Sequence, residues 1–216
     1  MSAMILAAGR GERLRPITDK TPKALVEVHG VSLLERHLQR LADAKIETVV
    51  INLGWLGEQI AERIGSGQQY GLQVVYSPEY DNILDTGGGI KRALPLLERA
   101  PFWIINADIF TDMPLPNIKL DPESLAHLVL VPTPGHKAAG DFELHDGKVR
   151  NSDNMNLTYS GIAFYRPEFF AKSGGGRFSV VPLLREAADD GLIEGSLFEG
   201  AWEDVGTPER LQRLNE

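Results

Sequence analysis

The chain has 216 residues, of which 43% are hydrophobic and 24% charged, and its net charge is −8. This length and apolar fraction suit an ordinary globular core, whereas the acidic balance argues against a general nucleic-acid-binding protein, which needs a basic face. The sequence contains no cysteine, which excludes disulfides, zinc–thiolate sites and cysteine nucleophiles.

The amino-terminal segment and the hydropathy of the chain predict a cytoplasmic protein. Residues 1–8 form too short an apolar stretch for a secretory signal, and charged residues follow at once. No apolar run approaches the roughly 18 residues that span a bilayer. We therefore expect small-molecule partners, no nucleic acid and no membrane, and either a monomer or a homodimer.

Apolar runs alternate with helical patterns in the first half of the chain. The predicted elements are strands at 3–8, 47–53, 72–77 and 101–110, and helices at 32–44, 56–65 and 87–100. Ser32 is placed to cap its helix, Gly65 to end the next one, and Pro95 to interrupt the third. This alternation is typical of a parallel sheet with helices on both faces.

After Asp112 the pattern changes to strands that are joined by turns. The predicted elements are strands at 127–133, 140–150 and 156–167, a helix at 179–191, and a last strand and helix within 199–216. Residues 145–148 fit a hairpin tip, and Thr207 can cap the last helix. We predict one α/β domain over residues 1–216, with a smaller, more antiparallel lobe in the part after residue 112.

The segment LAAGRGERL, residues 6–14, turns glycine-rich and cationic directly after the first strand. It is not the dinucleotide fingerprint G-x-G-x-x-G, because Leu14 occupies the place of the third glycine, and it does not match the P-loop pattern G-x-x-x-x-G-K-[ST] either. Gly9 and Gly11 have no side chains, so their backbone N–H groups can approach an anion. The segment therefore favours a phosphate site over the alternative, a purely structural turn.

Three cations accompany these glycines. Arg10 and Arg13 lie within the loop, and Lys23 follows Pro22, which restricts the backbone before it. Guanidinium groups and an ammonium beside bare backbone donors suit a polyphosphate.

Residues 6–28, LAAGRGERLRPITDKTPKALVEV, resemble the signature LxxGxGxRLxPxTxxxPKxLxxV of the sugar-phosphate nucleotidylyltransferases. Further segments of that family occur in order: TGGGI at 86–90, NADIF at 106–110, YSGIAFY at 159–165 and WEDVGTPERL at 202–211. The resemblance implies a Rossmann-like α/β fold with a mixed, mainly parallel sheet. It also implies a nucleotide-binding half at 1–112, a sugar-binding half at 113–216, and an enzyme that joins a nucleoside triphosphate to a sugar 1-phosphate and releases pyrophosphate.

The same resemblance assigns residues to the nucleotide. The expected nucleotide-binding residues are Ala7, Ala8, Gly9, Arg10, Gly11, Asp85, Gly87, Gly88 and Asn106, and the catalytic residues are Arg13 and Lys23. Gly87 and Gly88 would expose backbone groups to the base, and Asp85 would accept the N3–H of uracil. Asp85 stands where the related pattern has glutamate, so its side chain is shorter than the one in the family pattern. The alternative for this segment is a glycine-rich helix start without a ligand.

Two aspartates at strand ends are candidate metal ligands. Asp108 ends an apolar strand and Asp204 ends the last strand, where a carboxylate needs a partner or a metal. Together they would hold one Mg²⁺ that also contacts phosphate oxygens. The alternative for both is an N-cap of a following helix. Ala107 departs from the family pattern, which usually has glycine there.

The second half supplies the expected sugar site. By the resemblance, Asp141 would accept sugar hydroxyls, Ser160 and Gly161 would bind hydroxyl or acyl groups, and Trp202 would form an apolar wall.

The motifs are most similar to those of the short N-acetylmuramate-1-phosphate uridylyltransferases, which implies UTP as donor and a role in peptidoglycan recycling. A muramate carries a lactyl carboxylate, for which Arg150, Arg166 and Arg177 are candidate cations. The alternatives are a hexose-1-phosphate guanylyltransferase or thymidylyltransferase, and a non-catalytic nucleotide-sugar sensor.

Overall fold

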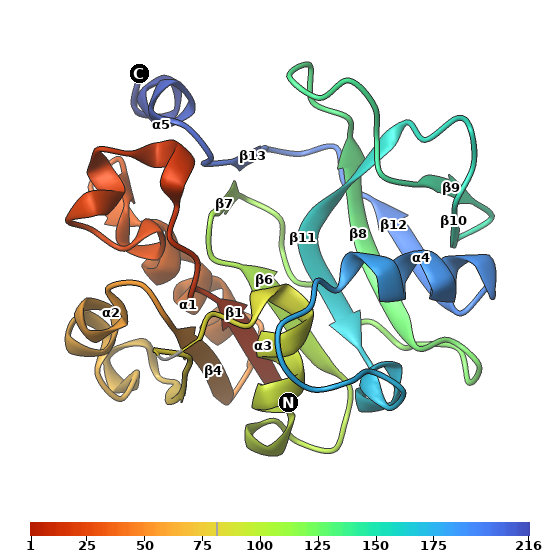
Figure 1. Ribbon diagram of the computed structural model, residues 1–216, viewed down its shortest axis with the longest axis horizontal. Helices are drawn as coiled ribbons and strands as arrows, with labels where there is room; N and C mark the ends of the chain where they lie inside the picture. Colours follow the sequence, from red (N-terminus) through yellow and green to blue (C-terminus); the bar gives the residue numbers. More distant parts are fainter. Residues whose placement is uncertain (81) are drawn as a thin grey trace.

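Figure 1 shows a computed structural model of the protein, which describes residues 1–80 and 82–216. Within these residues the largest sheet has nine strands, in the order β5-β4-β1-β6-β11-β8-β12-β10-β9. The strands are β1 (Ser2–Leu6), β4 (Thr48–Leu53), β5 (Gln73–Pro78), β6 (Phe102–Asn106), β8 (Ala126–Pro132), β9 (Glu143–His145), β10 (Lys148–Arg150), β11 (Leu157–Tyr165) and β12 (Ile193–Leu197). The sheet thus runs through both halves of the chain.

The first four strands of this sheet are parallel, as the sequence predicts. In β1, Ala3 lies opposite Val49 of β4 on one side and opposite Trp103 of β6 on the other. β11 then joins β6 in the antiparallel direction, with Ala163 opposite Ile104. The expected α/β fold with a mixed sheet is therefore confirmed, and the antiparallel strands of the second half extend the same sheet.

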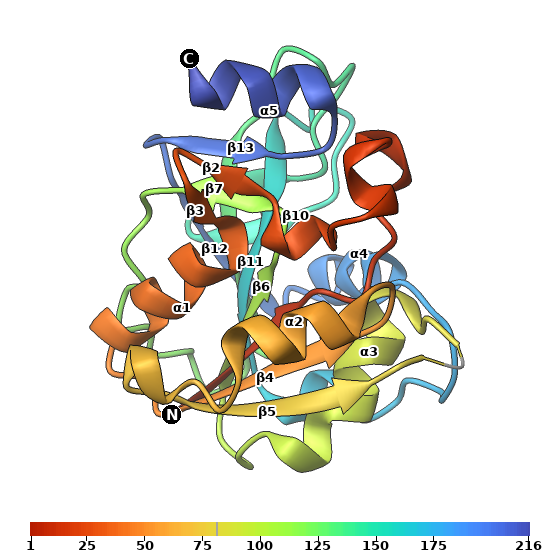
Figure 2. The same ribbon diagram turned by 90° about the vertical axis from the view of Figure 1, so that its left-hand side faces the viewer.

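Helices cover both faces of the sheet, because side chains of successive strand residues point to opposite faces. In β1, Ile5 packs with the cluster that contains α1 (Leu33–Asp43) and α2 (Gly57–Ile64). Met4 packs with the cluster that contains α3 (Asp85–Ala93) and α4 (Val181–Asp189). Figures 1 and 2 show the two helix layers on opposite sides of the strands.

The helix ends follow the local signals in the sequence. Ser32 and Glu35 form a capping box at the start of α1, and Gly65 is the C-cap of α2. α3 ends at Ala93 and passes into a 3₁₀ turn at Leu94–Leu96, where Pro95 cannot continue the helix. These three expectations are confirmed.

The expectation of one strand over 101–110 is wrong. β6 ends at Asn106, and a second strand, β7 (Ile109–Thr111), leaves the large sheet and pairs antiparallel with β13 (Trp202–Asp204). The backbone N–H of Ala107 still donates to Leu6 O (3.1 Å), and the chain then turns at Asp108. β12 was not expected, since its short segment IEGSL gives little periodicity.

The carboxyl-terminal helix α5 (Pro208–Asn215) returns to the beginning of the chain. It lies beside a small hairpin formed by β2 (Glu27–Val28) and β3 (Val31–Ser32), and His29 N–H donates to Asn215 Oδ1 at 2.7 Å. Figure 1 shows α5 next to this amino-terminal segment. None of the helices in the described part of the chain has the length and apolarity of a bilayer span.

Candidate active site

A cavity of about 1030 Å³ opens at the carboxyl ends of β1, β5 and β6. This edge is where open sheets with parallel strands place their ligands. The predicted residues that line it are Ala7, Ala8, Gly9, Arg10, Gly11, Arg13, Lys23, Asp85, Asn106 and Asp108. Residues that are far apart in the sequence, from four different elements, thus share one site.

The loop after β1 is folded back on itself around Gly11. This glycine has φ +62°, and an added Cβ would lie 2.9 Å from Thr18 Cγ2 and 3.1 Å from Lys23 Cβ. The Thr18 hydroxyl donates to Gly11 O at 2.8 Å. A Cβ at Gly9, by contrast, would meet open space among the described residues. Gly11 is therefore needed for packing, and Gly9 leaves its backbone accessible to the cavity.

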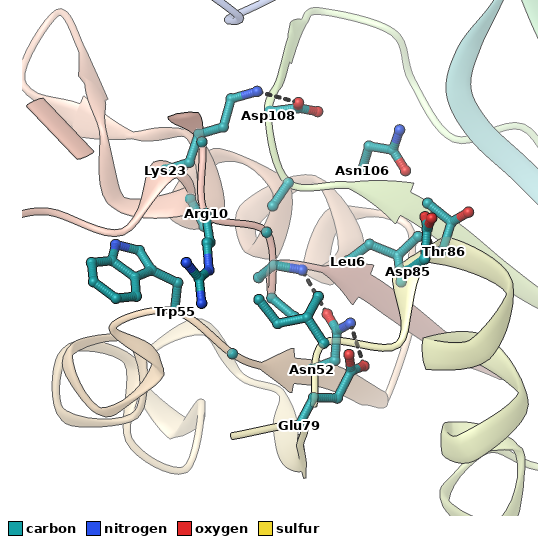
Figure 3. A pocket seen from close by; sticks show the side chains of 18 of the residues that line it. Leu6, Arg10, Lys23, Asn52, Trp55, Glu79, Asp85, Thr86, Asn106 and Asp108 are labelled. Carbon is teal, nitrogen blue, oxygen red and sulfur yellow. Dashed lines mark hydrogen bonds and ion pairs between the residues drawn. The ribbon is translucent and has the colours of Figure 1, made fainter. Parts of the chain in front are cut away.

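Arg10 lies against Trp55, a residue that the sequence reasoning missed. The guanidinium carbon lies 5.5 Å from the centre of the indole ring. Figure 3 shows the two side chains next to each other. The indole Nε1 donates to Thr18 O at 2.9 Å, and the Trp55 backbone N–H donates to Ala8 O at 3.2 Å. The ring is thereby tied to the loop on which Arg10 stands. A cation over an indole face is a favourable arrangement.

Lys23 and Asp108 form an ion pair in the cavity, with Nζ 2.5 Å from Oδ2 (Figure 3). Their side chains are 15% and 30% exposed, so both charges are only partly screened by water. Lys23 opens a short 3₁₀ turn directly after Pro22, which fixes the start of this turn. Two residues predicted for different roles are therefore in direct contact.

A buried polar network, also missed by the sequence reasoning, supports the other side of the cavity. Asn52 Oδ1 accepts from the backbone N–H of Ala7 at 2.6 Å, and its Nδ2 donates to Glu79 Oε1 at 2.8 Å. Glu79 Oε2 accepts from the N–H of Leu84 at 2.9 Å. Asn52 and Glu79 are 3% and 1% exposed, so their polar atoms need these partners. The network joins the ends of β1, β4 and β5 to the segment before α3 (Figure 3).

The only sequence signal for this network is the position of its members. A polar residue that ends an apolar strand, as Asn52 does in VVINL and Glu79 does after VVYSP, lies at the binding edge of a parallel sheet.

The start of α3 packs closely against a later segment of the chain. Asp85 has φ +63°, and its Oδ1 accepts from the N–H of Thr86 at 2.6 Å. An added Cβ at Gly87 would lie 2.3 Å from the Phe178 ring, and Gly88 N–H donates to Phe178 O at 3.1 Å. The structure thus gives both glycines a packing role. Their part in reading a base stays a prediction.

Asp204 is brought beside Asp108 by the pairing of β7 with β13. The N–H of Val205 donates to Asp108 O at 2.8 Å. The N-cap of α5 is Thr207, and Asp108 is followed by a strand, so the alternative of two N-cap aspartates is wrong. The backbones of Asp108 and Asp204 are therefore neighbours; Asp108 lines the cavity, and Asp204 lies outside its lining.

An arginine and a histidine lie against the carboxylate of Asp204. Arg210 Nη1 lies 2.6 Å and His136 Nε2 lies 3.4 Å from Asp204 Oδ1. An added Cβ at Gly206, which lines the cavity, would lie 3.1 Å from Asp204 Oδ2 and 3.3 Å from Arg13 Nη2. Arg13, from the loop after β1, and Asp204 thus both lie close to Gly206.

The predicted sugar residues lie on and beside β11. Gly161 has φ +80°, and an added Cβ there would lie 2.7 Å from Asn106 Nδ2. The indole Nε1 of Trp202 donates to Ser160 O at 2.9 Å. Gly161 packs against Asn106, which lines the cavity. The role of these residues in binding a sugar stays a prediction.

Asp141 is already bound on several sides. Lys137 Nζ lies 2.9 Å and 2.8 Å from its two carboxylate oxygens, and the N–H of Tyr159 donates to Oδ2 at 3.0 Å. These bonds hold the carboxylate against β11, and they use part of its capacity to accept sugar hydroxyls.

Comparison with known proteins extends these observations. The chain is 45% identical over 221 residues to an N-acetylmuramate alpha-1-phosphate uridylyltransferase of Neisseria meningitidis, covering 98% of this chain and 96% of that protein. It is 37% identical to the protein of the same description from Caulobacter vibrioides, covering 96% and 92%.

Among solved structures, a putative glucose-1-phosphate thymidylyltransferase from Bacillus anthracis superposes with a TM-score of 0.86. The two chains are 20% identical, and the match covers 100% of this chain and 94% of the other, which supports the fold. Residues 2–139 match the nucleotidyl transferase family. Because this match spans more than half of the chain and is joined by near-full-length relatives, the chain belongs to the nucleotidyl transferase family.

Proposed function

We propose that this protein transfers a uridylyl group from UTP to N-acetylmuramic acid 1-phosphate, giving the UDP-sugar and pyrophosphate. One observation carries the proposal: the glycine–arginine loop and the Lys23–Asp108 ion pair line the same cavity. The two near-full-length relatives named for this reaction support it.

The chemistry explains why the site consists of glycines, cations and carboxylates. An oxygen of the sugar phosphate attacks the α-phosphorus of UTP, and the bond from that phosphorus to the bridging oxygen breaks as pyrophosphate leaves. The attacking phosphate is already ionised, so the protein supplies no nucleophile. Its task is to position two anions against each other and to stabilise the charge on the leaving group.

Each residue of the loop has a place in this scheme. The backbone of Gly9 and Gly11 and the guanidinium of Arg10 bind the β- and γ-phosphates. Arg13 stabilises the leaving pyrophosphate, and Lys23 binds between the α-phosphate and the sugar phosphate. Trp55 holds the guanidinium of Arg10 at the cavity.

The donor set at the strand ends fits a hard divalent cation. Carboxylate oxygens are the ligands that Mg²⁺ prefers, and Lys23 and Arg210 already lie against Asp108 and Asp204, so this edge attracts positive charge. We infer that Asp108 and Asp204 hold Mg²⁺. When bound, the ion would neutralise phosphate oxygens of the substrates.

The remaining assignments follow from the reaction. We place the activity in the cytoplasm, in peptidoglycan recycling, with small molecules as its partners and a monomer or homodimer as its assembly state.

Pyrophosphate release tests the substrate pair. The purified protein is assayed with each of UTP, CTP, GTP and dTTP against N-acetylmuramic acid 1-phosphate, N-acetylglucosamine 1-phosphate, glucose 1-phosphate and mannose 1-phosphate. We expect the highest kcat/KM for UTP with the muramate. A higher value for GTP or dTTP with a hexose 1-phosphate would instead support a guanylyltransferase or thymidylyltransferase.

A second experiment separates an enzyme from a nucleotide-sugar sensor. Asp108→Asn should lower turnover at least about 100-fold while UTP binding persists, because the substitution removes charge from the reacting centre. Asp146→Asn is the matched control, since this aspartate lies in the β9–β10 hairpin with a side chain that is 89% exposed. A wild-type protein that binds UTP and releases no pyrophosphate with any sugar phosphate would be a sensor.

A further inference from the structure

The proposed acceptor carries a carboxylate that other sugar 1-phosphates lack, so its recognition calls for a cation. Three arginines of the second half are candidates, and the structure separates them. The guanidinium of Arg166 donates to Ser124 O at 2.8 Å and to Asp121 O at 3.3 Å, so it supports the backbone. Arg150 is exposed on β10, near the far edge of the sheet. Arg177 alone of the three lines the large cavity.

Arg177 lies in a segment that is fastened to α3. We call residues 174–180, which precede α4, the strap; Figure 1 shows this part of the chain running alongside α3. The N–H of Phe178 donates to Leu84 O at 3.1 Å, and Phe178 O accepts from the N–H of Gly88 at 3.1 Å. Both backbone bonds are made by Phe178, the residue directly after Arg177. The strap therefore presents Arg177 at a fixed point of the cavity rim.

Two glycines of α3 allow this close approach. An added Cβ at Gly88 would lie 2.2 Å from Gly176 O, and one at Gly87 would lie 2.3 Å from the Phe178 ring. Contacts this short do not occur, so any larger residue would push the strap away from the helix. The glycine run at the start of α3 thus serves to position Arg177.

A second cavity of about 160 Å³ lies beside the first. Both cavities are lined by Leu6, Asp85, Thr86 and Asn106. The second one is closed by Ser179 and Val180 of the strap and by Tyr159 and Tyr165 of β11. It thus adjoins both the nucleotide site and the strap.

The walls of this second cavity can bind a polar group. Tyr165 is fully buried, and its hydroxyl, which makes no hydrogen bond of standard geometry among the described residues, lies near the phenol of Tyr159. Burial raises the pKa of Tyr165 well above its ordinary value, so the phenol stays neutral and can donate. An unpaired hydroxyl in a cavity of this size fits an acyl or ether substituent of a small ligand.

We propose that Arg177 binds the carboxylate of the lactyl substituent and thereby selects an acidic sugar phosphate over a neutral one, with the substituent directed toward the second cavity. The proposal rests on the proposed function and names the residue that sets its specificity. A planar guanidinium can bind both oxygens of a carboxylate, and this geometry adds specificity for a carboxylate to the attraction between the charges.

The test compares two acceptors that differ only in the lactyl group. Values of kcat/KM are measured with UTP for N-acetylmuramic acid 1-phosphate and for N-acetylglucosamine 1-phosphate, on the wild type, Arg177→Gln and Arg177→Lys. Arg177→Gln should lower kcat/KM for the muramate about 10- to 100-fold, the range for a lost charge-assisted hydrogen bond, and change the neutral sugar and the KM for UTP less than about twofold. Arg177→Lys should recover part of the loss, and Arg150→Gln, the matched control, should change neither sugar.

Two outcomes overturn the proposal. Equal losses for both sugars, or a higher KM for UTP, would make Arg177 a phosphate-binding residue, and unchanged kcat/KM values for both sugars would leave it without a role. A wild-type protein that does not use the muramate refutes the proposed function separately. In that case, inhibition of its turnover by the muramate 1-phosphate still tests Arg177: inhibition lost in Arg177→Gln supports the carboxylate site, and unchanged inhibition overturns it.

Discussion

His37 is expected to make the protein less stable in mild acid. Its side chain lies on the inner face of α1 and is 1% exposed, and Arg40 Nη1 lies 3.0 Å from its Nδ1. Because a guanidinium can only donate, Nδ1 must accept, which requires an unprotonated nitrogen. Burial, and then the charge of Arg40, lower the pKa of His37 to about 3.

The direction and size of the effect follow from this pKa. In the unfolded chain the histidine has a pKa of about 6.5, so between pH 6.5 and 3 the unfolded state binds a proton that the folded state does not. The free energy of unfolding is therefore highest above pH 6.5 and falls as the pH drops through this window. At pH 5 the loss from His37 alone amounts to about 2 kcal/mol. For a chain of this length that corresponds to a melting temperature lower by roughly 4–8 °C.

Urea unfolding of the wild type and of His37→Gln at pH 7.5 and pH 5.0 measures this contribution. Glutamine keeps an acceptor for Arg40 and cannot be protonated, so the wild type should lose about 2 kcal/mol more than the variant over the interval. His127, whose pKa burial also lowers, is present in both proteins and cancels in the comparison. Equal losses in the two proteins, or an NMR titration of His37 near pH 6.5, would refute the reasoning.

Three further predictions concern the site. Lys23→Ala should lower kcat for pyrophosphate release about 100- to 1000-fold, because it removes a cation from the transferring phosphate and leaves Asp108 unpaired, whereas Lys20→Ala on the same loop should have no effect. Gly88→Ala should destabilise the protein by about 1–3 kcal/mol in urea unfolding, since its Cβ meets backbone of the strap; Gly175→Ala, where an added Cβ has open space, should stay within about 0.5 kcal/mol. Trp55→Leu should raise the KM for UTP roughly 2- to 30-fold with little change in kcat, and Trp55→Phe, which keeps a ring face, should raise it less.

Features that depend on neighbouring residues could be predicted from the sequence. Ser32 caps a helix through Glu35, three residues away, and Thr207 does so through Arg210. The loop after β1 is similar, because its glycines, prolines and cations act within about twenty residues of one another. Its identification therefore needed only spacing, and the structure places it at the cavity.

Features that depend on distant pairing could not be predicted in this way. Nothing near Asp108 in the sequence indicates that the strand ends before it and that β7 pairs with a strand almost one hundred residues later. Asn52 and Glu79 each look like an ordinary polar residue at a strand end, and only the fold joins them to Ala7. Trp55 acquires its role from Arg10, on a different loop.

Several contacts around the site join residues before position 112 to residues after it. Gly88 holds the strap that carries Arg177, Asn106 fills the space that Gly161 leaves, and Asp108 accepts the backbone bond that aligns Asp204. A donor site and an acceptor site that share such contacts keep a fixed separation, which is what an in-line attack of one anion on another requires. A Cβ at Gly88 or Gly161 would therefore move one half of the site relative to the other, so these glycines help to keep this separation fixed.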